Sequence, residues 1–202
     1  MNLWYGSNQE LLCQLFGEED YAAYDGSLRR LFAPPQAPST GASGRRRRVV
    51  SKHHHLQQRC TLARELVRRW LHEELQQAPV LTQPDHVSHF LQLRFAGQEH
   101  ESFCVLFLDA QHRLLVAEEL FRGTLTQTAV YPREVLKSAL HWNAAGVILA
   151  HNHPSGVGQP SQADRQLTDT LKKTLALLDV HVLDHFIIAG REVVSFARQG
   201  WL

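Results

Sequence analysis

Two histidines and an aspartate in one short segment constrain this chain most strongly. The segment reads HNHPSGVGQPSQAD and runs from His151 to Asp164. Two imidazoles and one carboxylate are ligands that zinc accepts, and three protein ligands leave a fourth tetrahedral position open. An open position distinguishes a catalytic zinc from a structural one. The segment therefore predicts a metal site formed by His151, His153 and Asp164, and the fold has to bring these three side chains together.

The residues before the histidines predict a buried strand. Residues 145–150 form a short apolar run with β-branched members, which is typical of a strand buried on both faces. Side chains alternate along a strand, so His151 and His153 are expected to point to the same side. Pro154 cannot donate to a sheet ladder, and Gly156 follows it closely. We therefore expect both imidazoles at the end of a strand.

The residues after the histidines predict a helix that begins beside them. Ser161 is suited to an N-cap and Asp164 then lies in the first turn. Leucines follow at positions 167, 171, 175 and 178, all on one helical face. An alternative is that Ser161 and Asp164 only form a capping pair and that the histidines are surface residues. The combination of strand end, Gly/Pro loop and acidic helix start favours the metal site.

This segment resembles the JAMM (MPN-plus) metalloprotease signature, in which H-x-H is followed by seven residues and then S-x-x-D. The form H-N-H-P-S-G resembles more narrowly the RadC family of bacterial proteins, with Asn152 where deubiquitinating JAMM enzymes usually carry Ser or Thr. The likeness extends through most of the C-terminal part of the chain, in the segments Phe121–Val135, Ala139–Ala150, Val182–Gly190 and Gly200–Leu202.

The resemblance implies a fold and a set of site residues. The fold class is α/β (α+β), a JAMM/MPN-like curved mixed sheet flanked by helices, with one bound zinc. By position in the signature, the ligands are His151, His153 and Asp164, and Ser161 is the serine that helps to stabilise an oxyanion. The JAMM glutamate lies upstream at the start of a strand, which favours Glu101. Two alternatives in the next predicted strand remain, Glu118 and Glu119.

These parts together predict a zinc-dependent peptidase or isopeptidase that uses a zinc-bound water, on an unidentified peptide or protein substrate. Zinc lowers the pKa of bound water from ~15.7 to about 7. A carboxylate such as Glu101 adds general acid–base help worth about 10²–10⁴ in rate, and the hydroxyl of Ser161 can donate to the oxyanion. No nucleophilic serine or cysteine is required. Cys104 lies in an apolar run and is predicted to be a small hydrophobic residue. His185 could contact the ligands from behind, but a packed or partly exposed histidine is favoured.

Composition limits the remaining possibilities. The chain has 202 residues and 44% hydrophobic residues, enough for one well-packed domain and a smaller piece. Its three cysteines show no paired spacing, so we expect no disulfide framework and a reducing, cytoplasmic setting. No apolar stretch reaches the ~20 residues of a membrane span, and no signal peptide is evident. The net charge of +1 provides no global electrostatic case for nucleic-acid binding.

The N-terminal part is predicted to be a helical region over residues 1–80, followed by the JAMM/MPN-like metal-binding domain over residues 81–202. Within the first part we expect short helices near residues 11–16 and 28–32, and a Pro/Gly/Arg-rich linker near 33–52. A helix is expected from about residue 56 to 76. The RadC resemblance implies a helix-hairpin-helix domain here, but its glycine-bearing hairpin is not recognisable, so its DNA-binding role is not carried over.

A basic cluster in this region leaves a second function open. Four consecutive arginines, Arg45, Arg46, Arg47 and Arg48, are able to contact phosphate, although a solvated segment is the favoured reading of their sequence. The alternative function is a DNA-associated repair or recombination accessory protein without hydrolytic activity. A non-catalytic scaffold is a third alternative, against which the intact set of metal ligands argues.

The C-terminal part has a regular order of expected elements. A helix over residues 86–93 precedes a strand pair at 103–108 and 113–121. Pro132 suits the first turn of a helix that ends near residue 143. The helix from residue 161 to about 179 comes next, and strands at 180–189 and 192–196 form a final hairpin.

Overall fold

The computed structural model describes residue 13 and residues 44–82, 84–123 and 130–202, with side chains in the first long helix described from Gln57 onward. The chain divides into two compact units, Met1–Val67 and Arg68–Leu202. The helices expected near residues 11–16 and 28–32 lie outside the described residues apart from Cys13, as does the expected linker up to residue 43. The domain boundary predicted between residues 80 and 81 stays a prediction.

The first described helix, α4, spans Gly44–Gln77 and is longer than the sequence predicted. The prediction that it starts near residue 56 is wrong, and residues 44–52, expected to belong to the linker, are helical. No proline occurs between Gly44 and Pro79, and the arginines, lysine, glutamines and leucines of this stretch have high helix propensity. The helix ends two residues before Pro79, because a proline disfavours helical backbone in the residue before it.

Apart from a 3-10 helix that was not predicted, the elements that follow agree in type and order with those expected from the sequence. They are the 3-10 helix η2 (Val80–Thr82), α5 (Pro84–Phe95), β1 (Ser102–Leu108), β2 (Leu114–Arg122), α6 (Pro132–His141), β3 (Gly146–Asn152), α7 (Gln162–Ala176), β4 (His181–Ala189) and β5 (Glu192–Ser195). The mixed α+β class with a sheet flanked by helices is therefore confirmed.

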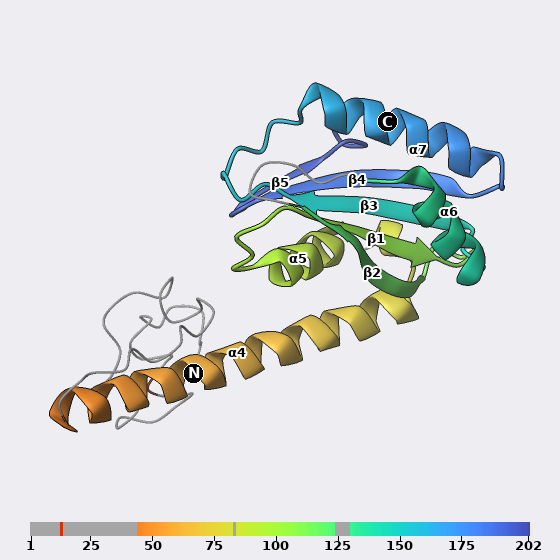
Figure 1. Cartoon of the computed structure of the whole chain (residues 1–202). Helices are drawn as coiled ribbons and strands as arrows, with labels where there is room; N and C mark the ends of the chain where they lie inside the picture. Colours follow the sequence, from red (N-terminus) through yellow and green to blue (C-terminus); the bar gives the residue numbers. More distant parts are fainter. Residues whose placement is uncertain (1–12, 14–43, 83, 124–129) are drawn as a thin grey trace. The chain divides into compact units, whose positions relative to one another are not determined.

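The five strands form one mixed sheet in the order β2-β1-β3-β4-β5 (Figure 1). The pairs β1–β2, β1–β3 and β4–β5 are antiparallel, whereas β3 and β4 are parallel. Parallel neighbours require a crossover connection, and α7 supplies it between β3 and β4. The strand that carries His151, β3, therefore lies in the middle of the sheet. The helix that carries Asp164, α7, follows it in the chain.

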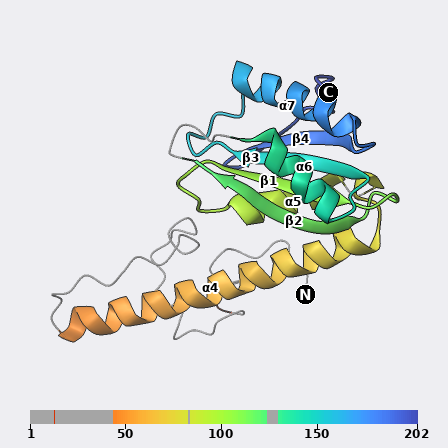
Figure 2. The same ribbon diagram turned by 45° about the vertical axis from the view of Figure 1, so that its right-hand side comes forward.

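Helices cover both faces of the sheet, and each face has its own apolar core. Alternating residues of β1 explain the two cores: Cys104, Leu106 and Leu108 face one way, Phe103, Val105 and Phe107 the other. The first set packs with α5 and the end of α4, the second with α6 and α7. Figure 2 shows α5 and α7 on opposite sides of the sheet. All seven residues of β3 are buried, which confirms the prediction of a strand buried on both faces.

Two further observations concern the chain as a whole. Its three cysteines, Cys13, Cys60 and Cys104, are free thiols. Among the described residues, no helix combines the length and the apolar character that crossing a membrane demands.

Two leucines at the end of α7 allow the packing of this helix to be tested. Leu175 is fully buried, while Leu177 is 84% exposed. We expect Leu175→Ala to lower the free energy of unfolding by about 2–5 kcal/mol, because a cavity remains under the helix. Leu177→Ala is the matched control and should change it by less than about 0.5 kcal/mol. Chemical denaturation of both variants measures the difference, and equal losses would contradict the packing described.

Candidate metal centre

The two histidines lie where β3 ends, close to the parallel neighbour β4. His151 is the second-last residue of β3 and is 2% exposed, and His153 is the first residue beyond the strand. The backbone N–H of His153 still donates to the carbonyl of Ile188 in β4, at 2.9 Å. This hydrogen bond extends the strand pairing by one residue. The alternation of the strand is kept, and both rings lie on the same face.

The aspartate is held in place by the start of α7. Ser161 is the N-cap, and a capping box joins it to Asp164. The backbone N–H and the hydroxyl of Ser161 both donate to Oδ2 of Asp164, at 2.7 and 2.6 Å. Oδ1 of the same carboxylate lies 3.3 Å from Nε2 of His151. The capping pair and the metal site, which the sequence posed as alternatives, therefore use the two oxygens of one carboxylate and are compatible.

The three predicted ligands lie close together. Among the described residues, no other group of three or more His, Cys, Asp or Glu side chains is placed so that it could hold a metal ion. Nε2 of His151 lies 3.0 Å from Nε2 of His153, and Oδ2 of Asp164 lies 3.8 Å from the latter atom. For metal–ligand distances of about 2.0–2.2 Å, neighbouring ligand atoms of a tetrahedral site are roughly 3.3–3.6 Å apart. The separations of 3.0 Å between the two nitrogens and 3.3 Å between Oδ1 and His151 lie close to that range, and one ligand atom from each residue lies within 4.8 Å of the others. The donor set therefore suits a small divalent cation.

A backbone contact determines which nitrogen of His153 faces the cluster. Nδ1 of His153 lies 2.7 Å from the carbonyl oxygen of Val157, in the loop before α7. A carbonyl only accepts hydrogen bonds, so Nδ1 carries the proton that is donated. In the neutral ring Nε2 then has a lone pair, which points toward His151 and Asp164.

A third histidine lies directly beneath the cluster. His185 in β4 is fully buried, and its Nε2 lies 2.8 Å from Nδ1 of His151. Burial, and next the nearby His151 ring, lower the pKa of His185 well below its ordinary value, so this ring is neutral. The sequence prediction that His185 is packed is confirmed, but the preference against a contact with the ligands is wrong. The missing information was the register, which pairs His185 with Leu149 and so places it on the face of His151.

The charge of Asp164 is stabilised by its surroundings. Burial alone acts to raise the pKa of this carboxyl. Hydrogen bonds from the His151 ring, when that ring is protonated, and from Ser161 outweigh burial and hold the pKa below its ordinary value. The position between the rings and the carboxylate therefore attracts positive charge.

Glu101 precedes β1 by one residue, and the backbone around it is held from two sides. Its carbonyl accepts from the N–H of Gly123 at 2.8 Å. The side chain of Asn152 donates to the carbonyl of His100 at 2.9 Å and accepts from the N–H of Ser102 at 2.7 Å. Asn152 thus links β3 by hydrogen bonds to the backbone on either side of Glu101, a role that the sequence analysis missed.

The register of β1 distinguishes the three candidate glutamates. Phe103 pairs with His151, and strand alternation places Glu101 on the same face as this pair. Glu119 pairs with Cys104, which faces the opposite core. Glu118 pairs with Val105, on the face of the histidines but further from the strand end. The backbone arrangement favours Glu101, and its role as general base stays a prediction.

Two other predicted site residues have clear surroundings. The hydroxyl of Ser161 donates to Asp164 and accepts from the Asp164 N–H at 3.1 Å, so donation to an oxyanion requires the hydroxyl to turn. Cys104 is fully buried, and burial raises its pKa to about 11, which agrees with its predicted role as a small hydrophobic residue.

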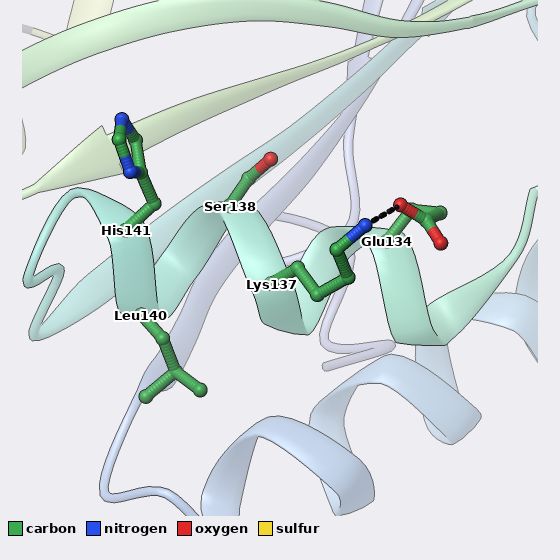
Figure 3. Close-up of a pocket in the computed structure, with 5 residues that line it drawn as sticks. All are labelled: Glu134, Lys137, Ser138, Leu140 and His141. Atoms are coloured by element: carbon green, nitrogen blue, oxygen red, sulfur yellow. Dashed lines mark hydrogen bonds and ion pairs between the residues drawn. The ribbon is translucent and has the colours of Figure 1, made fainter.

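An open groove on α6 is separate from the cluster. Figure 3 shows its lining, in which Lys137 turns toward Glu134 and forms an ion pair at 2.7 Å. The remaining lining residues are Ser138, Leu140 and His141. None of the three metal-cluster residues borders this groove, and its only paired charges neutralise each other. The candidate site is therefore the histidine–aspartate cluster.

Replacement of Ser161 tests the capping role. We expect Ser161→Ala to cost about 1 kcal/mol of stability, because the N–H of Asp164 loses its acceptor. Ser161→Asn should retain most of the stability, since asparagine is an equally good N-cap. Thermal or urea unfolding in the presence of a chelator measures both. Ser155→Ala, in the exposed loop, is the control, and a loss as large as that of Ser161→Ala would argue against the cap.

The C-terminal part of this chain is similar to known proteins. A family model described as the RadC-like JAB domain matches residues 81–201. UPF0758 proteins are similar over 138 residues, or 68% of this chain: that of Herminiimonas arsenicoxydans is 59% identical and that of Methylibium petroleiphilum 61% identical. The matched segment spans 62% of the length of each of these two relatives, which is less than two thirds.

Proposed function

This chain belongs to the RadC family, with a RadC-like JAB domain at residues 81–201, and on that premise we propose that it is a zinc-dependent hydrolase of peptide or isopeptide bonds. The observation that supports the proposal is the convergence of His151, His153 and Asp164 at the end of a central strand. Three nitrogen and oxygen ligands with an open fourth position are the arrangement of catalytic zinc sites.

The hydrogen-bond pattern around the cluster supports a bound cation. Nε2 of His153 has a lone pair, and it lies only 3.0 Å from Nε2 of His151, beside a carboxylate. Two lone pairs and a negative charge at this separation repel one another unless a proton or a cation lies between them. A proton can bridge only two of the three groups, whereas a metal ion binds all of them.

The residues around the cluster have distinct proposed roles. When bound, zinc supplies a Lewis acid that polarises a scissile carbonyl and lowers the pKa of water to about 7. Glu101 accepts a proton from the attacking water and delivers it to the leaving amine. The hydroxyl of Ser161 turns from Asp164 toward the carbonyl oxygen as negative charge develops there. The substrate is a peptide or protein whose identity is open.

Phosphate contact by the four arginines at residues 45–48 stays a prediction, as does a cytoplasmic location. These arginines lie at the beginning of α4.

Metal analysis tests the first part of the proposal. We expect about one zinc per chain in protein purified without chelator, and its loss from His153→Ala and Asp164→Ala, because each removes a ligand. His181→Ala is the matched control, since His181 is exposed and lies outside the cluster. Adding zinc to the stripped wild type at about 100 times its dissociation constant should raise stability by about 2.7 kcal/mol. Two histidines and a carboxylate also suit iron(II), so stoichiometric iron instead of zinc would contradict the proposal.

Hydrolysis tests the second part. On a library of peptides and isopeptide-linked conjugates, Glu101→Gln should lower kcat by about 10²–10⁴ while zinc content and fold are retained. Glu118→Gln is the control, because this residue lies further from the strand end. If Glu118→Gln abolishes turnover and Glu101→Gln does not, the assignment of the general base is wrong. Wild-type protein that carries zinc and cleaves no member of the library would contradict the hydrolase.

A further inference from the structure

A buried pair of residues, His185 and Thr168, forms a second layer beneath the cluster. Thr168 lies one turn after Asp164 on α7 and is 2% exposed. His185 is fully buried, with the ring of Phe196 at 4.7 Å and that of Phe103 at 5.9 Å between ring centroids. Neither Thr168 nor His185 has a part in the proposed hydrolysis.

The directions of the hydrogen bonds in this layer follow from the number of available protons. Oγ1 of Thr168 lies 2.6 Å from the backbone carbonyl oxygen of Asp164 and 2.6 Å from Nδ1 of His185. A carbonyl has no proton to donate, and a hydroxyl has one. Thr168 therefore donates to Asp164 and accepts from Nδ1–H of His185.

The proton on Nδ1 of His185 determines the state of His151. A charged imidazolium is costly at this fully buried position among phenylalanine rings, so the His185 ring carries one proton and its Nε2 is an acceptor. That acceptor lies 2.8 Å from Nδ1 of His151, which must then donate. In a neutral His151 ring, Nε2 is left with the lone pair that faces Asp164 and His153.

We propose that His185 and Thr168 are positioning residues, which hold His151 in the Nδ1–H tautomer that a metal ion requires. This inference rests on the proposed function, in that the metal is the zinc proposed above. Nδ1–H of His151 donates to His185, Nδ1–H of His185 donates to Thr168, and Thr168 donates to the backbone carbonyl of Asp164. Oδ1 of Asp164 in turn lies 3.3 Å from Nε2 of His151. These three hydrogen bonds, from His151 through His185 and Thr168 to Asp164, form a relay. The relay joins two ligands from different elements, β3 and α7, and helps to set their separation.

The arrangement differs from simple packing in what it demands of position 185. Metal-binding histidines commonly donate their second N–H to a carboxylate or a backbone carbonyl, and loss of that partner weakens metal binding by about 10–100-fold. Here a neutral imidazole is the partner. A leucine at this position fills apolar space but leaves the N–H of His151 unpaired. A glutamine has an amide oxygen to accept from His151 and an amide N–H₂ to donate to Thr168.

The test measures tautomers and zinc affinity in the full chain. Long-range ¹H–¹⁵N spectra of metal-free protein at alkaline pH should show His151 as the Nδ1–H tautomer. Competition with a chromophoric chelator should show zinc affinity weakened about 10–100-fold in His185→Leu and Thr168→Val. His185→Gln and Thr168→Ser should restore it to within a few-fold of wild type. Phe196→Leu is the packing control, which should lower stability and leave the tautomer unchanged.

Each outcome decides the inference separately from the proposed function. An Nε2–H tautomer of His151 in the wild type would overturn the relay, as would wild-type zinc affinity in both His185→Leu and Thr168→Val. If His185→Leu does not fold, the smaller Thr168→Val and Thr168→Ser changes carry the comparison. Wild-type protein that shows the Nδ1–H tautomer and binds no zinc would overturn the proposed function, while the relay would stand.

Discussion

The parallel pairing of β3 with β4 is the interaction on which the site depends. Because parallel neighbours need a crossover, the chain that leaves β3 has to return over one face of the sheet, and α7 is that return. The helix therefore begins beside the strand end that carries the histidines. The same pairing includes the hydrogen bond from the N–H of His153 to β4, and its register places His185 beside His151. A change in this register would move His185 away from His151.

The groups of the site are held in place by interactions that also stabilise the fold. Asp164 is fixed by the capping box of α7, and the first imidazole by burial at the end of a central strand. His153 is fixed by the carbonyl of Val157 in a short loop. Side chains already ordered in this way lose little conformational entropy when they bind an ion. The free energy needed to bring these polar groups together comes from folding of the domain and not from ligand binding.

Much of the C-terminal part could be predicted from the sequence because its signals are local. Alternation of apolar residues, a proline at a helix start and a serine at a helix cap each act within a few residues. The resemblance to the RadC family then added the roles of Ser161 and Glu101, which spacing alone does not provide. The start of α4 was missed because a run of arginines is compatible with both a solvated segment and a helix. Only the lack of a proline or glycine over residues 45–77 separates them.

By itself the sequence determined that His151, His153 and Asp164 lie close together. A strand end, a short loop and a helix cap follow one another directly in the segment from His151 to Asp164. The tertiary structure alone decided the partners from distant segments. His185 contacts His151 across 34 residues of chain, and Asn152 bridges to His100 and Ser102 across about 50. Such contacts depend on which strands pair and in which register. That choice is made by the packing of two cores against the whole sheet, and no local pattern encodes it.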